Sequence, residues 1–489
     1  MTSNNLTVRN LAFINGNYTA AVTGKVYPVH NPADGTVITE VSACDAIDVR
    51  CAAQHARAAF DDGRWSSLRP SDKKKRMLAF ADLIEANAAE LAALETRNTG
   101  KPIRDTETVD IPKSVNMLRW YAEAADKIYG GVAPTAPSVH AFISREPLGV
   151  IGAVIPWNFP LYLAAYKLGP ALVTGNSIVI KPADQTPLSL LRVAELASLA
   201  GIPDGVLNVV PGSGESVGQA LGLDPDVDAL AFTGSPQVAK RFLAYAAESN
   251  MKKVMIEGGG KCANIVLADV EDLDRAAFDA AWGVFFNNGQ VCSAGSRLVV
   301  EESIADQLIE KIRNLTANIR VGDPSDPATE IGAIIDERHL NNIERFVRGG
   351  ESDGAILVCG GKRLLEHTGG WYFEPTIFDH ARNDMDIARD EIFGPVLTVI
   401  RAGDAEEAID IANDSQFALG AALWTQDVTK ALKYAKQLRA GQVWVNNYDG
   451  SDLTVPWGGF RLSGTGRDKS LEALNEYTGS KATWIEVAR

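Results

Sequence analysis

The sequence predicts an α/β protein built on doubly wound parallel sheets, and three observations support that fold class. Between residues 147 and 254, short β-branched runs alternate with longer helix-like runs, the order that parallel strands joined by crossover helices require. The chain has 489 residues, enough for about three units of roughly 100–200 residues each. Its apolar fraction of 46% and charged fraction of 22% are ordinary for soluble globular proteins, which excludes intrinsic disorder and collagen-like structure.

The first parallel sheet is expected between residues 149 and 260, and open sheets of this kind bind ligands beyond the carboxyl ends of their strands. The first helix is expected to break near Pro170, because proline removes a backbone hydrogen bond. We expect strands at 149–155, 177–183, 206–212, 228–235 and 252–260. We expect helices at 161–175, 188–201, 215–222 and 236–249.

A second βα-rich stretch is expected from near residue 264 to about residue 460. Upstream of both stretches, residues 50–126 consist mainly of amphipathic helical runs rich in Ala and Leu. The clearest elements of the second stretch are a strand at 263–270, a long helix at 272–289, and strands at 296–304 and 394–402.

Two segments read as exposed β-structure. Residues 131–146 are short, polar and β-prone and predict a hairpin, and the last 16 residues, 474–489, read as an exposed strand. An exposed edge strand attracts other strands, so we expect a partner subunit to pair with it. No repeat, low-complexity tract or flexible linker separates the pieces, so we expect them to pack as one compact body.

Charge and cysteine usage narrow the class further. The net charge is −15, which argues against general binding of nucleic acid or anionic membranes, because both need basic patches. Five cysteines in 489 residues are sparse and odd in number, so a disulfide scaffold is excluded and a reduced cytoplasmic compartment is expected.

One segment, residues 147–166, has the length of a membrane span and no formal charge. It contains Pro156, Asn158 and Pro160, and a helix through them would lose backbone hydrogen bonds in lipid. We therefore expect no membrane span there, and the N-terminal residues show no secretory signal pattern.

The glycine clusters do not form a complete phosphate-binding motif. Gly212, Gly214 and Gly218 give GxGxxxG, one residue away from the dinucleotide fingerprint. Gly260 and Lys261 lack the earlier glycine of a P-loop. Taken alone, each cluster is better explained as a turn than as a site.

Metal-dependent and serine-dependent hydrolysis are also disfavoured. The six histidines do not approach zinc-ligand spacing, and the chain has no CxxC pair, so no metal site is expected. The GxSxG elbow of serine hydrolases is absent as well. The histidines are His30, His55, His140, His339, His367 and His380.

Cys292 is the cysteine with the most informative surroundings. It lies in FFNNGQVCSAGSR (285–297), after a long apolar run, with small residues that let backbone approach a ligand closely. A thiol held near backbone N–H groups favours the thiolate. The alternative is a buried structural cysteine, which is the interpretation kept for Cys44, Cys51, Cys262 and Cys359.

Four further residues combine with Cys292. Glu257, at a strand end before a glycine run, is a candidate general base. Asn158, an amide in an otherwise apolar turn, can donate to a developing oxyanion. Lys181 and Glu391 are charged residues at the boundaries of apolar segments.

Together these segments resemble the aldehyde dehydrogenase superfamily over essentially the whole chain. Seven motifs occur in the family's order: PWNFP, KPADQTP, FTGS, EGGGK, GQVCSAGSR, EIFGPV and PWGGFRLSGTGRD. The resemblance implies two doubly wound parallel-sheet domains plus a small β oligomerisation element, in a homodimer or homotetramer. It implies an NAD-binding domain at 1–124 and 148–257, a catalytic domain at 258–460 and an oligomerisation element at 125–147 and 474–489.

The resemblance also implies a chemical role for each residue of the catalytic set Cys292, Glu257, Asn158 and Lys181. Cys292 would attack the aldehyde to form a thiohemiacetal, with the Asn158 amide and its own backbone N–H as the oxyanion hole. Oxidation would leave a thioester on Cys292, and Glu257 would activate the water that hydrolyses it. The substrate would be a small-molecule aldehyde.

The implied cofactor is NAD, with NADP as the alternative. Glu391 would bind the nicotinamide ribose with Phe393 nearby, Lys181 and Asp184 the adenosine ribose, and Trp157 and Ser235 the pyrophosphate region. The full implied set is Ile155, Pro156, Trp157, Lys181, Asp184, Gly214, Gly218, Thr233, Gly234, Ser235, Gly258, Glu391 and Phe393.

Three positions depart from the family pattern. Asp184 stands where Glu is usual; its carboxylate still repels a 2′-phosphate and favours NAD. Gly258 stands where Leu usually follows the catalytic Glu, so we expect Glu257 to be more mobile. Ala239 replaces a frequent glycine and is expected to tighten helix packing under the pyrophosphate.

Within the superfamily, the longer stretches resemble bacterial γ-glutamyl-γ-aminobutyraldehyde dehydrogenases of putrescine utilisation, so the expected substrate is that aldehyde or an aminoaldehyde. Asp110, Asp449 and Asp452 could receive a tail ammonium, and Lys113 a tail carboxylate; the alternative is that all four charges line a solvated funnel mouth. The implied pocket residues are Asp110, Lys113, Met117, Phe159, Tyr162, Tyr166, Val291, Ser293, Tyr448, Asp449, Asp452 and Trp457.

Three alternatives remain from the sequence. A semialdehyde or broad-specificity aldehyde dehydrogenase fits the same motifs. A CoA-acylating relative is disfavoured, because such members need no water-activating carboxylate and Glu257 is present. A non-catalytic role on the same fold is disfavoured by the retention of the catalytic set.

Overall fold

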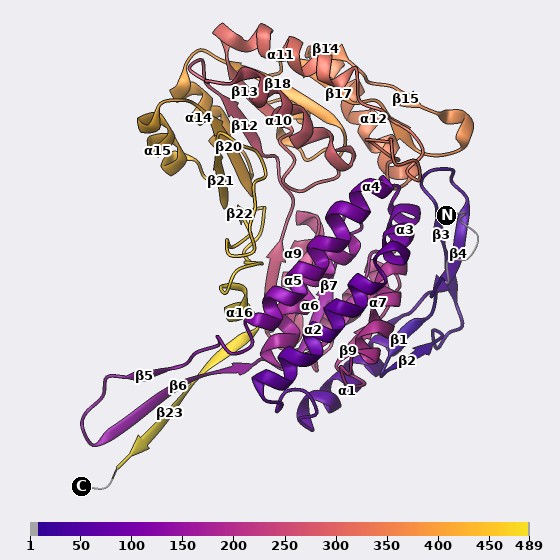
Figure 1. Ribbon diagram of the computed structural model, residues 1–489, viewed down its shortest axis with the longest axis vertical. Coiled ribbons are helices and arrows are strands. Elements are labelled where there is room, and N and C mark those ends of the chain that lie inside the picture. Colours follow the sequence, from indigo (N-terminus) through magenta and orange to yellow (C-terminus); the bar gives the residue numbers. More distant parts are fainter. Residues whose placement is uncertain (1–7, 488–489) are drawn as a thin grey trace.

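The computed structural model describes residues 8–487 and contains two seven-stranded sheets, each in its own lobe. Figure 1 shows the first lobe in indigo and magenta, the second in orange and yellow, and a narrow β-element that projects from the first. The α/β class with two mostly parallel sheets and a small antiparallel sheet is confirmed.

The first sheet has the strand order β11-β10-β7-β8-β9-β1-β2, and its five strands from β11 to β9 are parallel. All five expected strands are therefore present, each within the expected range. The bounds are β7 (Val150–Val154), β8 (Ser177–Lys181), β9 (Leu207–Val209), β10 (Ala229–Thr233), β11 (Lys253–Glu257), and the antiparallel β1 (Ala12–Ile14) and β2 (Asn17–Thr19).

Helices cover both faces of this sheet, because successive strand side chains point to opposite sides. Along β7, Ile151 and Ala153 join one buried cluster, whereas Val150 and Val154 join another. The first cluster includes α2 (Pro70–Ala86), α3 (Ala88–Thr99), α5 (Ile111–Glu123), α6 (Pro160–Thr174) and α7 (Leu188–Leu199). The second includes α1 (Ala46–Asp61), α8 (Gln219–Leu223) and α9 (Pro236–Glu248).

The expected break of α6 at Pro170 is wrong, since the helix runs unbroken from Pro160 to Thr174. A proline inside a helix removes one backbone hydrogen bond, and here tertiary packing outweighs that loss. The helix is buried almost all round, and Gly169 lies so close to Tyr121 of α5 that an added Cβ would come within 2.3 Å of its ring.

The second sheet has the order β14-β17-β18-β13-β12-β20-β21, with only β14 antiparallel. Its strands are β12 (Ala263–Val266), β13 (Arg297–Glu301), β14 (Ile356–Cys359), β17 (Thr376–Asp379), β18 (Val396–Ala402), β20 (Gly420–Trp424) and β21 (Gln442–Val445). Its helices are α10 (Leu273–Phe285), α11 (Glu302–Thr316), α12 (Glu337–Ser352), α13 (Asp386–Arg389), α14 (Ala405–Asn413) and α15 (Val428–Gln437).

Helix α10 ends earlier than the expected 272–289. Its α-helical part stops at Phe285, because Asn287 and Asn288 adopt left-handed backbone with φ of 49° and 56°. Asparagine tolerates this region better than most residues. The resulting tight turn delivers the chain to Cys292.

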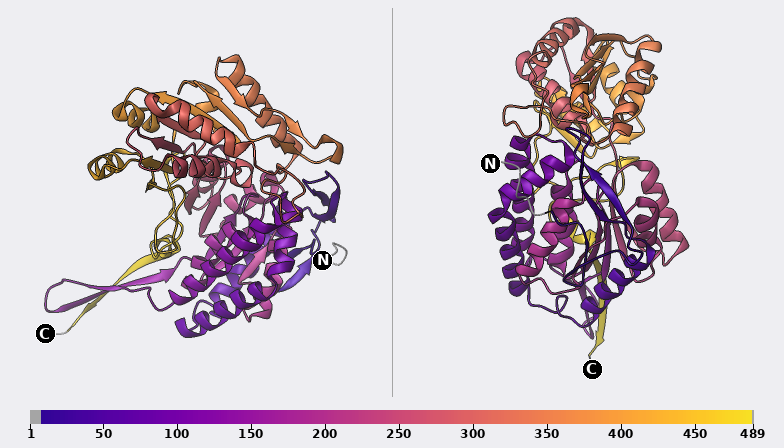
Figure 2. Two further views of the ribbon diagram at one scale, coloured as in Figure 1. Left: turned by 45° about the horizontal axis from the view of Figure 1, so that its top comes forward. Right: turned by 90° about the vertical axis from the view of Figure 1, so that its right-hand side faces the viewer.

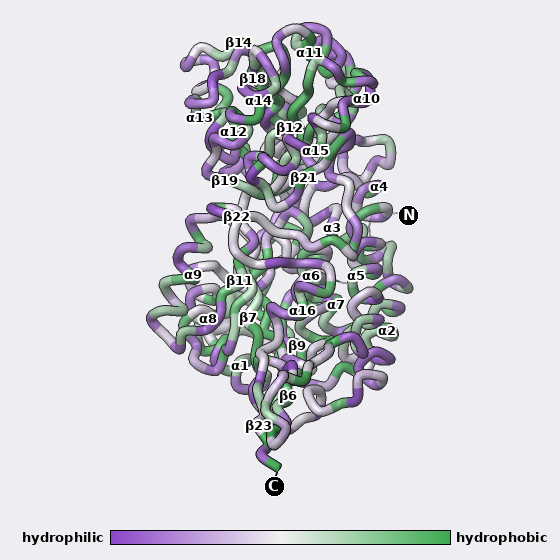
Figure 3. Tube along the Cα trace, turned by 90° about the vertical axis from the view of Figure 1, so that its left-hand side faces the viewer, coloured by the Kyte–Doolittle hydropathy of each residue, from purple (hydrophilic) through white to green (hydrophobic). Residues whose placement is uncertain are grey.

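The projecting element is a three-stranded antiparallel sheet of β5 (Gly131–Ala133), β6 (Val139–Pro147) and β23 (Thr478–Glu486). The expected hairpin and terminal strand are both present, and β23 pairs with β6 of its own chain. Because β23 stays at the edge of this sheet, its pairing with a partner subunit remains a prediction. The expectation of one compact body is wrong here, since Figures 1 and 2 show this sheet extending away from both lobes. Figure 3 shows apolar residues reaching its tip, where Trp484 is 66% exposed.

The remaining elements are short connections. Among residues 8–487, no helix combines the length and apolar character needed to cross a membrane. The short elements are β3 (Val26–His30), β4 (Val37–Ser42), β15 (Arg363–Leu364), β16 (Tyr372–Phe373), β19 (Phe417–Ala418), β22 (Phe460–Arg461), α4 (Ile103–Asp105), α16 (Ala473–Glu476), and single turns at Thr106–Asp110, Gly214–Gly218, Phe286–Gly289 and Glu366–Thr368.

Candidate active site

Four neighbouring parallel strands of the first sheet deliver candidate residues to one edge. Strand β8 ends at Lys181, β10 at Thr233 and β11 at Glu257, while β7 leads directly into Trp157 and Asn158. The pairing aligns Val154 of β7 with Lys181, and Thr233 with Glu257. The carboxyl ends of parallel strands meet at one edge, which is where ligands bind in such sheets.

Cys292 reaches this edge from the second lobe. Gly260 lies so close that an added Cβ would come within 2.2 Å of the Cys292 carbonyl oxygen, so only glycine allows the two segments to meet. Asn158 Nδ2 donates to the carbonyl of Gln290, two residues before Cys292, at 2.8 Å. The structure therefore brings Cys292, Asn158 and the strand that ends in Glu257 together.

Glu257 lies in an enclosed position suited to a general base. Burial raises the pKa of Glu257 to about 8, with the nearby Asp468 carboxylate adding to the effect. The Trp457 indole Nε1–H donates to Glu257 Oε1 at 3.1 Å, which favours the ionised form, and Oε2 is buried without a partner. A base with a pKa near the working pH can both take and release a proton.

The expectation that Gly258 leaves Glu257 more mobile is not supported. Gly258 N–H donates to Ser463 O at 2.9 Å, and an added Cβ would lie 2.4 Å from the Leu462 carbonyl. Glu257 itself is 2% exposed and bridges to Gly464. Close packing against the 462–464 segment, rather than a leucine side chain, holds this carboxylate.

A polar path runs behind Glu257. Lys167 Nζ and Asp468 Oδ2 are 2.5 Å apart, and both side chains are buried. A narrow cavity of about 10 Å³ is lined by Lys167, Glu257 and Asp468, a volume that fits about one water. Lys167 and Asp468 therefore form a buried ion pair beside the candidate base.

The thiol of Cys292 is held in its neutral form. Burial raises the pKa of Cys292 well above its usual value, and the carboxylates of Glu257 and Glu391 add to the rise. A thiolate there needs either loss of a proton to a nearby base or a compensating positive charge.

The Glu391 carboxylate contacts the glycine run that follows Glu257. Its Oε1 accepts from the Gly260 N–H at 2.9 Å, and a Cβ on Gly259 would lie 2.1 Å from Oε2. Burial raises the pKa of Glu391 to about 7. Phe393, two residues on, packs edge to face on Trp157 with ring centroids 5.2 Å apart.

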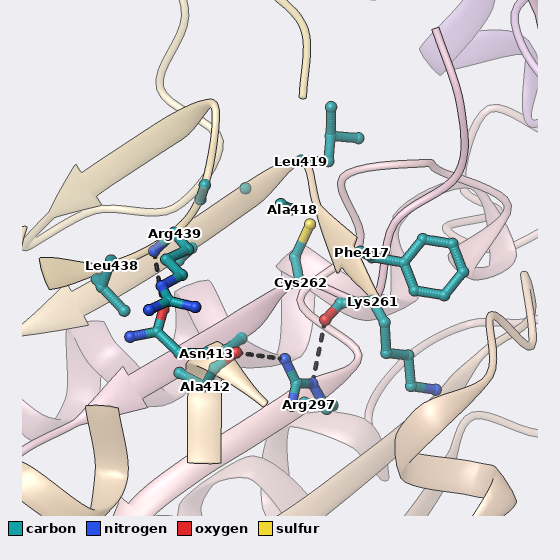
Figure 4. Close-up of a pocket in the computed structure, with 14 residues that line it drawn as sticks. Lys261, Cys262, Arg297, Ala412, Asn413, Phe417, Ala418, Leu419, Leu438 and Arg439 are labelled. Atoms are coloured by element: carbon teal, nitrogen blue, oxygen red, sulfur yellow. Dashed lines mark hydrogen bonds between the residues drawn. The ribbon is translucent and has the colours of Figure 1, made fainter. Parts of the chain in front are cut away.

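Arg297 holds the backbone at Lys261 in place. Arg297 is 2% exposed and donates to the carbonyl oxygens of Lys261 and Ala412, as Figure 4 shows, while the Lys261 ammonium points away from the small pocket drawn there. That ammonium is buried without a partner, and burial lowers the pKa of Lys261 to about 7. Buried Cys262, whose thiol pKa burial raises to about 12, completes this supporting layer.

The expected cofactor residues lie along the same strand edge and fit a dinucleotide. Ser235 caps the N-terminus of α9, where backbone N–H groups attract phosphate, and the Thr233 hydroxyl is buried without a partner. Gly214 has open space where a side chain would be. Lys181 Nζ donates to Asp184 Oδ1 at 2.6 Å, so the two residues that are expected at the adenosine ribose lie side by side.

The other expected cofactor positions support these groups rather than offering side chains. Ile155 N–H donates to the Lys181 carbonyl, and Gly234 N–H to that of Glu257. Gly218 packs beside Phe242 of α9, and Ala239 lies in the buried cluster beneath the same helix. Pro156 continues the buried turn between β7 and Asn158.

A cavity of about 260 Å³ opens beside the segment that carries Cys292. Five of the expected substrate residues line it: Lys113, Val291, Ser293, Tyr448 and Asp449. Ser293 Oγ donates to Asp449 Oδ1 at 3.1 Å, and burial raises the pKa of Asp449. Lys113 and Asp449 thus place a cation and a carboxyl group in the cavity beside the segment that carries Cys292.

Three expected aromatic residues lie outside this cavity lining and form a row that packs against Phe286, which belongs to the lining. Phe159 stacks on Phe286 with centroids 6.3 Å apart, and Tyr162 lies between Phe159 and Tyr166. Lys113 Nζ lies 5.7 Å from the Tyr162 ring centre, within cation–π range.

Four expected pocket residues have other places. Asp110 is fully buried in an ion pair with Lys101, whose ammonium lies 3.6 Å from the centre of the Phe159 ring, so its carboxylate is not available to a tail ammonium. Asp452 is exposed and accepts from Thr454 within its own turn. The indole N–H of Trp457 donates to Glu257. Met117 is fully buried in the core.

Asp279, Trp282 and Phe286 line the cavity but were missed by the sequence analysis. Asp279 is 8% exposed; its Oδ1 accepts from Arg275 and its Oδ2 has no partner. A signal was present, because positions 279, 282, 283 and 286 share one helical face with i, i+3 and i+4 spacing. In the sequence analysis, this segment is treated only as the long apolar run that precedes Cys292.

The fold is α/β, and the site combines a candidate cysteine nucleophile with a sheet edge that fits a dinucleotide. The family model described as the aldehyde dehydrogenase family matches residues 18–483. The chain belongs to that family and is an NAD(P)-dependent aldehyde dehydrogenase.

Individual relatives match over nearly full length. The NADP/NAD-dependent aldehyde dehydrogenase PuuC of Escherichia coli strain K12 is 48% identical, over 99% of this chain and 97% of the relative. A crystal structure of an indole-3-acetaldehyde dehydrogenase complexed with NAD⁺ is 52% identical with a TM-score of 0.98, covering 99% of this chain and 98% of that one. The γ-glutamyl-γ-aminobutyraldehyde dehydrogenase of Burkholderia cenocepacia J2315 is 47% identical with a TM-score of 0.97, covering 99% and 98%.

Proposed function

We propose that this enzyme oxidises an aminoaldehyde or γ-glutamyl-aminobutyraldehyde to the carboxylic acid through an acyl intermediate on Cys292. The observation that carries the chemistry is the convergence of Cys292, Asn158 and Glu257 at the edge where β7 and β11 end. No other cysteine combines a carboxylate base with an amide donor in this way among the described residues.

The proposed reaction has two halves. In the first, Glu257 takes the thiol proton as Cys292 adds to the aldehyde carbon, and the Asn158 amide and the Cys292 N–H donate to the oxyanion. When bound, NAD supplies the acceptor for the hydride that leaves the thiohemiacetal carbon. The product of this half is a thioester on Cys292.

In the second half, Glu257 removes a proton from water, which adds to the thioester carbon. Collapse of that adduct releases the carboxylic acid and returns the Cys292 thiol. The proton that Glu257 took from the thiol leaves between the two halves through the Lys167–Asp468 pair, whose Nζ and Oδ2 atoms lie 2.5 Å apart. The proton that Glu257 then takes from water returns to the departing thiolate of Cys292. Catalysis by such a positioned base contributes typically about 10²–10⁴-fold.

We propose NAD as the preferred cofactor, with NADP as the alternative. Asp184 places a carboxylate beside Lys181, where it repels a 2′-phosphate, but Lys181 partly neutralises it. The name of the Escherichia coli relative includes both cofactors. A comparison of kcat/KM for NAD and NADP in the wild type and in Asp184→Asn tests this preference.

Opposite charges in the cavity support the proposed substrate class. Lys113 offers a cation, while Asp449 and Asp279 offer carboxylates, and a γ-glutamyl tail carries both an ammonium and a carboxylate. The alternative substrates are semialdehydes or a broad range of aldehydes. A role in polyamine breakdown follows if the γ-glutamyl substrate is the physiological one.

We also propose functional units for the chain. Residues 1–124 and 148–257 form the NAD-binding domain, 258–460 the catalytic domain, and 125–147 with 474–489 the oligomerisation element. The exposed Phe142, Trp484 and Ile485 on the projecting sheet support pairing into a homodimer or homotetramer. The five free cysteines support a reduced cytoplasmic location.

The test is a kcat/KM panel with NAD and four aldehydes: γ-glutamyl-aminobutyraldehyde, a free aminoaldehyde, a semialdehyde and a neutral aldehyde. The proposal predicts the highest value for the γ-glutamyl substrate or the aminoaldehyde. A flat profile would assign the enzyme to the broad-specificity alternative, and absence of NADH formation with all four would overturn the proposal.

A further inference from the structure

His339 lies in the site although no motif singled it out. It belongs to the first turn of α12, and its backbone N–H donates to the capping Asp336 side chain at 2.7 Å. Its ring Nε2 lies 2.7 Å from the Phe393 carbonyl oxygen. A carbonyl oxygen only accepts, so the imidazole must carry its proton on Nε2 and donate it.

The His339 ring also completes a triangle of aromatic contacts. Its centroid lies 5.5 Å from that of Trp157 and 6.2 Å from that of Phe393, and those two rings are 5.2 Å apart. All three contacts are edge to face, an arrangement that aromatic pairs favour. Trp157 follows a strand of the first sheet, whereas His339 and Phe393 belong to the second lobe, so the triangle joins the two.

The loop from Glu391 to Gly394 is held at both ends. At one end, Glu391 accepts from the Gly260 N–H. At the other, Phe393 has left-handed backbone with φ of 56°, which residues with a side chain rarely adopt, and its carbonyl is held by His339. Gly394 then packs against Ile343 of α12, where an added Cβ would lie within 2.7 Å.

We propose that His339 is a positioning residue for the nicotinamide end of the cofactor. Its Nε2–H holds the Phe393 carbonyl, and through that loop it fixes the distance between Glu391 and Trp157. This inference rests on the proposed function, in which Glu391, Phe393 and Trp157 receive NAD. The other interpretation is that His339 only fills space between α12 and the loop.

Two variants separate these interpretations. His339→Phe keeps an aromatic ring for packing but cannot donate, and His339→Gln keeps a donor near the position of Nε2 without the ring. His367→Phe, at an exposed histidine in the Glu366–Thr368 turn, is the matched control. For each protein, the Kd of NAD alone is measured by titration calorimetry, together with KM for NAD, KM for aldehyde and Tm.

The proposal predicts that His339→Phe raises the Kd and KM for NAD about tenfold, the effect of one lost buried hydrogen bond, with KM for aldehyde within about twofold. His339→Gln should recover NAD affinity to within about threefold of the wild type. Wild-type Kd in His339→Phe would overturn the proposal, as would equal loss of affinity and Tm in both variants. Failure of the wild type itself to bind NAD would overturn the proposed function as well.

Discussion

The catalytic centre and the substrate cavity lie side by side but are built in different ways. At the centre, backbone sets the geometry: glycines 258–260 admit no side chain, and strand ends place Glu257 and Asn158. In the cavity, side chains set the geometry, and they come from α5 and the turn before it, from α10 and the turn after it, and from the 291–293 and 448–449 segments. The chemistry is thus fixed by contacts that few substitutions can satisfy, whereas the cavity can change one side chain at a time.

The largest expected effect belongs to the centre. Cys292→Ala removes the nucleophile, so NADH formation from aldehyde should fall about 10⁴-fold or more, while Tm and NAD affinity stay close to those of the wild type. Steady-state absorbance at saturating NAD measures this loss. Retention of full activity in Cys292→Ala would contradict the assignment of the nucleophile.

Substitutions in the cavity should act on selectivity rather than on chemistry. Asp279→Asn should lower kcat/KM about tenfold for aldehydes with a tail ammonium, because one charged partner is lost, and leave neutral aldehydes unchanged. Lys113→Met should do the same for aldehydes with a tail carboxylate. The measurement is the four-aldehyde panel run on both variants.

The exposed Asp452 provides the matched control for the cavity charges. Asp452→Asn removes a carboxylate that accepts from Thr454 outside the cavity lining, so its panel should match that of the wild type. If Asp279→Asn and Lys113→Met lower kcat/KM equally for all four aldehydes, the cavity charges stabilise the structure and do not recognise the charge on the substrate tail.

A smaller effect is expected at Trp457, which the sequence analysis places in the substrate cavity and the structure places beside Glu257. Trp457 was expected to line the pocket, but its indole donates to Glu257 and lowers the pKa of that carboxyl against the effect of burial. Because the base acts when ionised, deacylation in the wild type should rise with pH through about 8. Trp457→Phe should move that midpoint upward by about half a unit to one unit, the equivalent of one hydrogen bond.

The measurement is the pH profile of kcat under conditions in which hydrolysis of the thioester limits turnover. A change in aldehyde selectivity with an unchanged profile would mean that Trp457 belongs to the cavity and not to the centre.

The same contrast explains what sequence reasoning could reach. The order of strands and the residues at their ends follow from local patterns, which is why β7 to β11 and the edge residues Lys181, Thr233 and Glu257 were predicted correctly in place. Long-range packing is not visible in such patterns. It keeps α6 unbroken through Pro170.

The pairing of side chains was equally out of reach. Asp110 was expected to be available for a substrate ammonium, but its carboxylate forms an ion pair with Lys101. No local pattern in the sequence distinguishes a paired carboxylate from a free one. Asp279 was overlooked because it comes from a helix far along the chain from Lys113. The projection of β5, β6 and β23 also depends on nine residue pairs between segments more than 330 positions apart.

The central claim is that oxidation leaves an acyl group on Cys292 and that Glu257 activates the water that removes it. The most direct measurement is intact-protein mass spectrometry of Glu257→Gln after mixing with NAD and aldehyde. The account predicts a mass increase equal to the acyl group of the aldehyde used, located on Cys292 after digestion and accompanied by about one equivalent of NADH. Free turnover of Glu257→Gln with no added mass would contradict it.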